Sequence, residues 1–227
     1  MKKRLIAILF LVLLAGCDDS NILGGQVAEL RVLHASPDAP GSDVLVDSLL
    51  AFSGLTFGQT SGYITLDEGQ RRIRVSQTGS AVPYIDVRYQ LLDGRYYTFV
   101  IADHVASIKA LLLEDEDVDP EFNKFKIRFL QAAPGAPAVD FYLAEQDANI
   151  SQLEPRAADI PFTGLTPYYG LGSGKYRIVI TRPGSKHPLI DTGPVPFDAR
   201  QIRTVVALDA PGGGPPFRAI ILVDRDT

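Results

Sequence analysis

The feature that most constrains this 227-residue chain is an internal duplication. Residues 29–47 (ELRVLHASPDAPGSDVLVD) align without a gap to residues 126–144 (KIRFLQAAPGAPAVDFYLA), and seven of the nineteen positions are identical. Later matches are FSGLT at 52–56 with FTGLT at 162–166, PYID at 83–86 with PLID at 188–191, and ALLL at 110–113 with AIIL at 219–222. A period of roughly 100 residues is domain-sized, well above the repeats of solenoids. The chain is therefore expected to form two tandem domains that differ by loop insertions.

The apolar pattern within the copies has a period of two. In residues 84–91 (YIDVRYQL) and 72–76 (RIRVS) apolar residues alternate with polar ones, as in half-buried strands. Further strands are expected at 30–35, 44–47, 63–66, 96–102 and 108–113, and in the second copy at 126–130, 141–143, 176–181, 202–208 and 218–223. About seven short strands per copy, bounded by Gly, Pro, Asp and Ser, fit a β-sandwich of immunoglobulin-like or transthyretin-like shape. The predicted fold class is all-β, with two tandem antiparallel sandwiches.

The first residues have the pattern of an export signal. Basic residues at 2–4 precede an apolar run at 5–14, then Ala15, Gly16 and Cys17. The run is shorter than the roughly 18 to 20 residues of a membrane-spanning helix. The sequence Leu-Ala-Gly-Cys resembles the lipobox of bacterial lipoproteins. This resemblance implies cleavage before Cys17 and lipid, including palmitate, on Cys17.

The expected organisation follows from this anchor. It comprises a signal peptide at 1–16, a lipidated tether at 17–28, a first sandwich at 29–119 and a second at 120–227. Two or three acyl chains hold a protein stably on a membrane, so we expect it on the periplasmic face of a bacterial membrane. Asp18 and Asp19 resemble the inner-membrane retention signal of enterobacterial lipoproteins, but other bacteria use this position differently, which leaves inner or outer membrane open. Cys17 is the sole cysteine, so the domains must fold without disulfides.

Several segments together resemble one known family. The segment at 32–40 (VLHASPDAP), the following 43–47 (DVLVD), 54–58 (GLTFG) and 61–63 (SGY) look like DUF4397. The resemblance extends over residues 29–227. It implies a β-rich domain of exported bacterial proteins, frequently in tandem, whose function is unknown. The second copy departs from the pattern, with Gln131, Ala133 and Gly135 at the positions of His34, Ser36 and Asp38.

The candidate catalytic residues do not form a known constellation. His34, Ser36 and Asp38 are close in sequence, but spacings of two around a proline do not establish a Ser-His-acid triad. A strand end followed by a stiff Pro-containing turn is the preferred interpretation. Asp43 and its counterpart Asp140 are expected to cap backbone amides rather than to bind a ligand.

The acidic segment 114–120 (EDEDVDP) places Asp115, Asp117 and Asp119 at alternate positions, like the start of a calcium loop. It lacks the glycine and the distant glutamate of an EF-hand loop, so a solvated interdomain linker is the preferred interpretation. Three dispersed histidines and no free cysteine give no zinc pattern.

Two further motifs have structural interpretations. The segment 170–175 (GLGSGK) departs from the phosphate-binding loop and is expected to be a hairpin turn. Tyr168 and Tyr169 are the best local candidates for an aromatic ligand platform, although most tyrosines fit strand patterns. With 22 basic against 27 acidic residues, nucleic acid is not an expected partner.

The sequence thus predicts no enzyme, catalytic residue, metal or cofactor. We expect a lipid-anchored envelope protein that acts as a binding, adhesion or scaffolding module for an envelope protein partner. One alternative is a periplasmic protein that binds a small ligand or calcium through the loops of the first domain. The other is an undetected hydrolase that uses Ser36.

Overall fold

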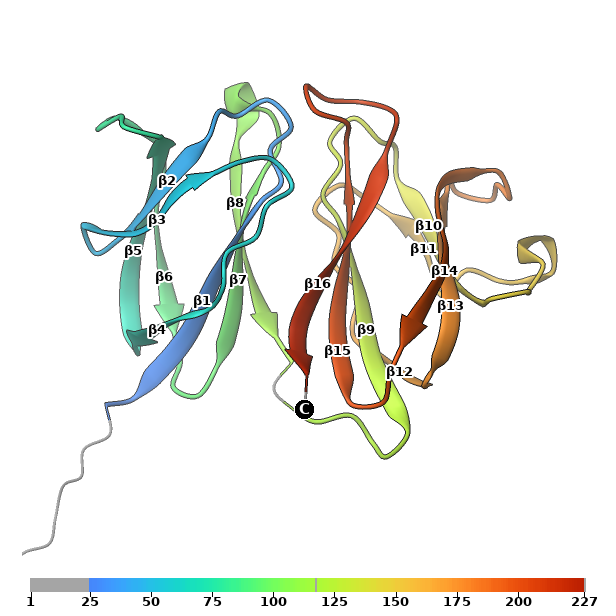
Figure 1. The fold of residues 1–227 in the computed structure, drawn as a ribbon. Helices are drawn as coiled ribbons and strands as arrows, with labels where there is room; N and C mark the ends of the chain where they lie inside the picture. The colour runs from blue at the N-terminus through green and yellow to red at the C-terminus, as the bar shows by residue number, and fades with distance from the viewer. Residues whose placement is uncertain (1–24, 117, 227) are drawn as a thin grey trace, which may run out of the picture.

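The computed structural model describes residues 25–116 and 118–226. Within this part, sixteen strands and two short 3-10 turns form two β-sandwiches, which lie side by side (Figure 1). Each sandwich contains two four-stranded sheets. The predicted all-β class and the two sandwich domains are confirmed.

The first sandwich contains strands β1 to β8. Its inner sheet has the order β4-β1-β7-β8 and its outer sheet the order β3-β2-β5-β6. The strands are β1 (Val27–His34), β2 (Ser42–Val46), β3 (Leu49–Leu55), β4 (Ile64–Asp67), β5 (Gly69–Gln77), β6 (Pro83–Leu91), β7 (Tyr96–Ala102) and β8 (Lys109–Asp115). A 3-10 turn, η1 (Val105–Ser107), connects β7 to β8.

The second sandwich repeats this plan with strands β9 to β16. Its inner sheet is β12-β9-β15-β16 and its outer sheet is β11-β10-β13-β14, the same order as in the first sandwich. The strands are β9 (Lys124–Gln131), β10 (Val139–Glu145), β11 (Ala157–Ile160), β12 (Tyr169–Gly172), β13 (Gly174–Thr181), β14 (Pro188–Phe197), β15 (Gln201–Leu208) and β16 (Arg218–Asp226). The turn η2 (Ile150–Gln152) lies in the long β10–β11 connection.

One strand pair in each sandwich departs from the expected antiparallel pattern. β1 runs parallel to β7, and β9 runs parallel to β15. Parallel neighbours need a long crossover connection, and here the intervening strands of both sheets supply it. The first strand of each domain is thereby held in the middle of the inner sheet.

Four strands were absent from the sequence prediction. β3 is exposed over much of its length, with Leu49 and Leu50 pointing to solvent, so its apolar alternation is weak. β14 contains three prolines and lies at a sheet edge, where proline is tolerated. β11 and β12 are only four residues long. The expected hairpin turn at 170–175 is wrong, because β12 and β13 belong to different sheets and Ser173 joins them at a corner.

Three apolar clusters hold the molecule together. One fills each sandwich, around Phe99 in the first and around Phe125, Phe129 and Phe141 in the second. A third cluster lies between the sandwiches, where the two inner sheets face each other. Successive residues of a strand point to opposite faces, so Val32 enters the domain core while Leu33 enters the junction. The inner sheets are thus buried on both faces.

The structure corrects one alignment between the copies. FTGLT at 162–166 corresponds to residues 57–61, and not to FSGLT at 52–56. Thr60 bridges to Leu33 as Leu165 bridges to Leu130, and the Ser61 hydroxyl accepts from the Val32 N–H as Thr166 accepts from Phe129. Gly58 and Thr163 share a positive φ. The true offset changes mainly in the β10–β11 connection, which is longer than the β2–β3 turn.

Candidate functional site

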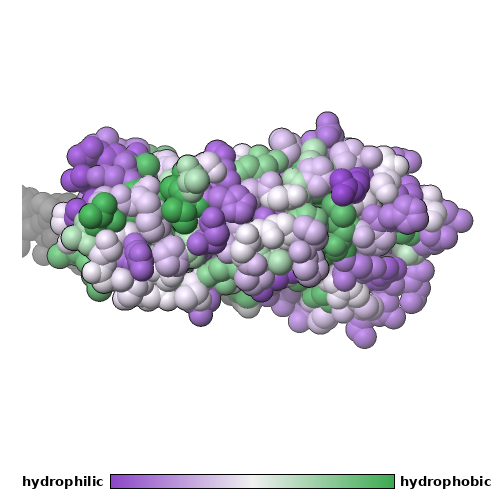
Figure 2. Space-filling view, turned by 90° about the horizontal axis from the view of Figure 1, so that it is seen from above, coloured by the Kyte–Doolittle hydropathy of each residue, from purple (hydrophilic) through white to green (hydrophobic). Residues whose placement is uncertain are grey.

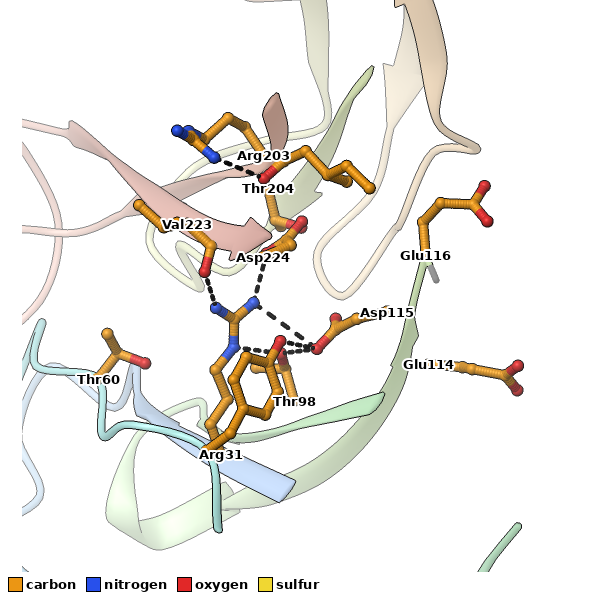
Figure 3. A network of polar contacts seen from close by, with 12 residues as sticks. Arg31, Thr60, Thr98, Glu114, Asp115, Glu116, Arg203, Thr204, Val223 and Asp224 are labelled. Carbon is orange, nitrogen blue, oxygen red and sulfur yellow. Dashed lines mark hydrogen bonds and ion pairs between the residues drawn. The ribbon is translucent and has the colours of Figure 1, made fainter. Parts of the chain in front are cut away.

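The most extensive polar network of the described residues crosses the junction between the sandwiches (Figure 3). The buried guanidinium of Arg31 reaches from β1 to the last strand of the second domain. It pairs with the Asp224 carboxylate and donates to the Val223 carbonyl oxygen at 2.6 Å. Its Nε donates to Thr98 Oγ1 at 2.8 Å, and Thr98 in turn donates to Asp115 Oδ2 at 2.6 Å.

The second sandwich makes the equivalent contacts to the first. Arg128 on β9 pairs with Asp115 of the first domain, and its Nη1 donates to the Glu114 carbonyl oxygen at 2.8 Å. Its Nε donates to Thr204 Oγ1 at 2.8 Å, and Thr204 donates to Asp224 Oδ2 at 2.6 Å. The junction therefore has pseudo-twofold symmetry, in which each arginine is neutralised by a carboxylate of the other domain.

A tyrosine completes each half of the network. Tyr63 donates to Asp115 Oδ2 at 2.6 Å and lies under the Arg31 guanidinium, 4.7 Å from the ring centroid. Tyr168 donates to Asp224 Oδ2 at 2.8 Å and lies 4.5 Å from Arg128. Burial, and then the adjacent carboxylate, raise the pKa of both tyrosine hydroxyls. Both hydroxyls thus remain protonated donors, and Tyr168 is part of the junction rather than of a ligand platform.

Apolar and cation–π contacts complete the junction. Its centre contains ten buried aliphatic side chains, namely Leu33, Ala35, Val100, Ala102, Leu113, Leu130, Ala132, Val206, Leu208 and Leu222. Lys109 lies 4.9 Å from the Phe162 ring, and its counterpart Arg218 lies 4.9 Å from the Phe57 ring. Charged groups at a buried contact need partners. The buried pairs Arg31–Asp224 and Arg128–Asp115 meet this need.

The prediction that the acidic segment 114–120 is a solvated linker is wrong for Asp115. Asp115 ends β8 and is 3% exposed, because Arg128, Thr98 and Tyr63 bind its carboxylate. Asp119 pairs with Arg225 at 3.0 Å and with Arg200 at 3.4 Å. Asp117 lies outside the described residues. The arginine contacts of Asp115 and Asp119 leave the calcium hypothesis without its first and third ligands.

The structure brings Ser36 and Asp38 together but gives His34 other hydrogen-bond partners. His34 is fully buried, and its Nε2 lies 3.0 Å from Ser42 Oγ and 3.3 Å from the Pro40 carbonyl oxygen. Burial lowers the pKa of His34, so the imidazole is neutral. Ser36 donates to Asp38 at 3.4 Å, and the other Asp38 oxygen lies 3.2 Å from His104 Nδ1.

The Ser36 neighbourhood is consistent with the predicted loop role rather than with a triad. The Asp38 carboxylate accepts from the Val105 N–H at 2.9 Å, which connects this loop to η1. In the second domain Gln131 replaces His34 and accepts from the Ala133 N–H at 3.1 Å. His34 Nδ1 has no hydrogen-bond partner among the described residues.

Asp43 and Asp140 have the predicted capping role. Asp43 accepts from the Gly54 N–H at 2.9 Å and the Gly79 N–H at 3.0 Å. Asp140 accepts from Asp159 N–H and Gly184 N–H, both at 2.8 Å. Hydrogen bonds from Gly79 and then from Ser53 lower the pKa of the Asp43 carboxyl. Each aspartate thus joins the edge strand, β3 or β11, to a turn of its outer sheet.

The outer edge of the first sandwich is open. A hollow of about 370 Å³ lies between β3 and β4, lined by Val46, Asp47, Leu49, Leu50, Ala51, Ile64, Thr65, Leu66, Asp67 and Arg71. Leu49 is 76% exposed and Leu50 is 61% exposed. Sequence analysis missed this surface because its residues come from edge strands of two different sheets.

The second sandwich carries larger side chains at the same edge, beside a hollow of about 330 Å³ lined by Tyr142, Leu143, Leu153, Glu154, Pro155 and Arg156. Tyr169 stands where the first domain has Ile64, as shown by the pairing of Tyr169 with Ile127 and of Ile64 with Leu30. The Arg156 guanidinium lies 5.7 Å from the Tyr169 ring, at the position of Ala51. Tyr176, at the position of Arg71, packs against Phe125 at 5.4 Å.

The second domain has a different hollow, of about 620 Å³. It lies between the β10–β11 connection and the β12–β13 corner, lined by Glu145, Gln146, Asp147, Ala148, Ser173, Gly174, Lys175 and Tyr176. From the loop end of the molecule, hydrophobic residues form small separate patches among hydrophilic ones over both domains (Figure 2).

Residues 25–116 and 118–226 contain no group of three His, Cys, Asp or Glu residues placed to hold a metal ion. No helix in this part of the chain is long and apolar enough to cross a membrane. Cys17, Asp18 and Asp19 lie outside the described residues.

Comparison with known families gives one match. The model of DUF4397, a domain of unknown function, matches residues 28–142. The chain belongs to this family. The match covers all of the first sandwich, β9 and the start of β10. No curated protein matches the chain.

Solved structures give only distant similarities. The *Bacillus anthracis* TIE protein is 12% identical, with a TM-score of 0.26, over 86% of this chain and 34% of that one. A CBM26 module of *Eubacterium rectale* Amy13K, solved with maltoheptaose, is 12% identical, with a TM-score of 0.27, over 86% and 96%. A streptococcal ancillary pilin is 15% identical, with a TM-score of 0.22, over 76% and 58%. The chain spans about a third of the length of the *B. anthracis* protein.

Proposed function

We propose that this chain is a lipid-anchored envelope protein in which two tandem DUF4397 domains form one rigid, non-enzymatic binding module. The observation that carries the proposal is the exchanged Arg–Asp network. Arg31 and Arg128 each bind a carboxylate and a carbonyl oxygen of the other domain, above a shared aliphatic cluster. Two domains joined in this way present their outer surfaces at fixed separation, as a scaffold requires.

The repeated architecture supports the tandem assignment. Both sandwiches have the same strand order and the same parallel pair, and both carry the aspartate cap at Asp43 or Asp140. The family match ends at residue 142, so residues 143–227 enter the family through this internal likeness alone.

The contacts of the polar loop residues support a non-enzymatic role. A hydrolase needs a nucleophile beside a base that a third group orients. Here the hydroxyl nearest to His34 is that of fully buried Ser42, whereas Ser36 bonds to Asp38. Incubation with fluorophosphonate probes tests this part, and we expect no label on Ser36 or Ser42. Labelling that an unfolded control lacks would refute it.

The anchor is supported by the sequence at Cys17 and is tested directly. Cells that express the wild type or Cys17→Ser are grown with labelled palmitate and fractionated. We expect label and membrane attachment for the wild type, and neither for the variant. A wild type without fatty acid, or a variant that remains on the membrane, would overturn the proposed anchor.

A further inference from the structure

The open edge of the first sandwich combines a hollow with unusually exposed leucines. Leu49 and Leu50 stand at 76% and 61% exposure beside a hollow of about 370 Å³ whose lining includes Ile64 and Leu66. Exposed apolar side chains that gather around a hollow mark an interaction surface more often than isolated ones do. This surface has no role in the junction, because none of its lining residues belongs to the apolar cluster between the domains.

The chain enters the first sandwich at this edge. Val27, the first residue of β1, pairs with Asp67, which lines the hollow. Cys17 precedes Val27 by ten residues, which span at most about 36 Å when fully extended. A lipid on Cys17 therefore keeps this edge within a few nanometres of the bilayer.

The internal copy shows that the exposed leucines are not a requirement of the fold. The corresponding edge of the domain farther from the anchor also has a hollow, of about 330 Å³, but Glu154 and Pro155 occupy the positions of Leu49 and Leu50 there. The difference between the copies thus follows their distance from the proposed anchor.

The charges around the hollow are compatible with a lipid headgroup region. Arg71 pairs with Asp47 at 2.9 Å and with Asp67 at 4.0 Å, which offsets part of the acidic charge at the rim. Leu49 and Leu50 begin β3 directly after the β2–β3 turn and are mostly exposed beside this ion-pair cluster. Apolar residues at such a tip can enter the boundary between headgroups and acyl chains.

We propose that the β3–β4 edge of the first sandwich is a membrane-docking surface, with Leu49 and Leu50 inserted into the outer part of the bilayer that carries the anchor. The inference rests on the proposed lipid anchor at Cys17. It orients the module with its first domain against the membrane and its second domain directed away.

The absence of tryptophan from the chain permits a direct test. Mature lipidated protein carrying Leu50→Trp is reconstituted into vesicles of phosphatidylethanolamine and phosphatidylglycerol, with and without lipids that bear a nitroxide quencher on the acyl chain. The matched control is Val82→Trp, because Val82 is 77% exposed on the β5–β6 turn, which lies at the other end of the sandwich from the chain entry (Figure 1). Circular dichroism establishes that both variants are folded.

We expect quenching to reduce the Leu50→Trp emission by about half or more and to leave Val82→Trp nearly unchanged, since insertion reaches only the outer 5–10 Å of the acyl region. Equal quenching of the two variants in lipidated protein would overturn the docking surface while leaving the anchor intact. A blue shift of Leu50→Trp that depends on protein concentration without vesicles would assign the surface to a second copy and also overturn it. Absence of fatty acid on Cys17 would instead refute the proposed function.

Discussion

The two sandwiches share strand order, register and an aspartate cap, yet they differ at the outer edge and at one buried position. The first domain exposes Leu49 and Leu50 at this edge, whereas the second carries Glu154 and Pro155 at the same positions. The buried position holds His34 in the first and Gln131 in the second. Duplication thus preserved the contacts that join the domains and left the distal surfaces to diverge.

The ion pairs of the junction, which both domains share, predict the largest effects on stability. Arg128→Ala removes the guanidinium from the buried carboxylate of Asp115, and Arg31→Ala does the same to Asp224. Loss of one partner of a buried ion pair costs about 3–5 kcal/mol in the free energy of unfolding. We expect similar losses for both variants in urea titrations.

Arg177→Ala is the control for this pair of variants. Its partner Asp191 lies on the solvent-facing side of the outer sheet, so we expect a loss below about 1 kcal/mol. A difference of more than about 2 kcal/mol between Arg31→Ala and Arg128→Ala would show that the two halves of the junction are not energetically equivalent.

The shared cap predicts an intermediate effect. Asp140→Ala leaves the amides of Asp159 and Gly184 without their acceptor, and Asp43→Ala does so for Gly54 and Gly79. We expect a loss of about 1–3 kcal/mol for each by thermal or urea unfolding. Asp→Asn at either site retains one acceptor oxygen and should cost less. An equal loss for Ala and Asn would indicate that charge, rather than hydrogen bonding, is responsible.

The buried histidine predicts a pH dependence that the second domain lacks. Burial holds the pKa of His34 below its ordinary value of 6.5, so near that pH the unfolded chain takes up a proton and the folded chain does not. The free energy of unfolding therefore falls as pH decreases below about 6.5, by at most about 1.4 kcal/mol per pH unit, until the lowered pKa is passed.

His34→Gln copies the second domain and should remove this contribution. Unfolding curves of the wild type and the variant between pH 7.5 and about 4.5 measure it as a difference, because the other titrating groups are shared. Gln131→His should introduce a dependence of the same sign. Parallel curves for wild type and His34→Gln would mean that His34 does not titrate differently on folding.

The open edge predicts the smallest effect on stability. Leu49→Ser and Leu50→Ser alter side chains that are mostly in solvent, so we expect changes within about 0.5 kcal/mol. Denaturant midpoints check this. A loss comparable to that of the cap variants would show that these leucines support the fold rather than face a partner.

The sequence predicted the all-β class and the capping role of Asp43 and Asp140, because alternation and turn residues act locally. It did not predict the junction. Asp115 has four acidic neighbours within four positions, so its sequence context indicates solvent, whereas tertiary contacts with Arg128 bury it. One signal for the junction was available in the sequence. Arg31 and Arg128 occupy equivalent positions of the two copies, and each lies within an otherwise apolar strand.

The sequence prediction also missed short strands and edge strands. β3, β11, β12 and β14 bury few side chains, and burial is the source of the periodic signal. The open hollow could not be predicted because it depends on which edge strands meet across two sheets.

Because the arginines are exchanged, each domain alone lacks the carboxylate that its arginine binds in the other domain. Synthesis delivers Arg31 nearly two hundred residues before Asp224, so a nascent first domain must wait with a cation at its inner sheet until the final strand arrives. A chain truncated before β16 lacks Val223 and Asp224, the acceptors of that cation, and also lacks Arg218, which lies over the Phe57 ring. In such a chain Asp115 of the same domain, 3.7 Å away, is the carboxylate that stays beside Arg31.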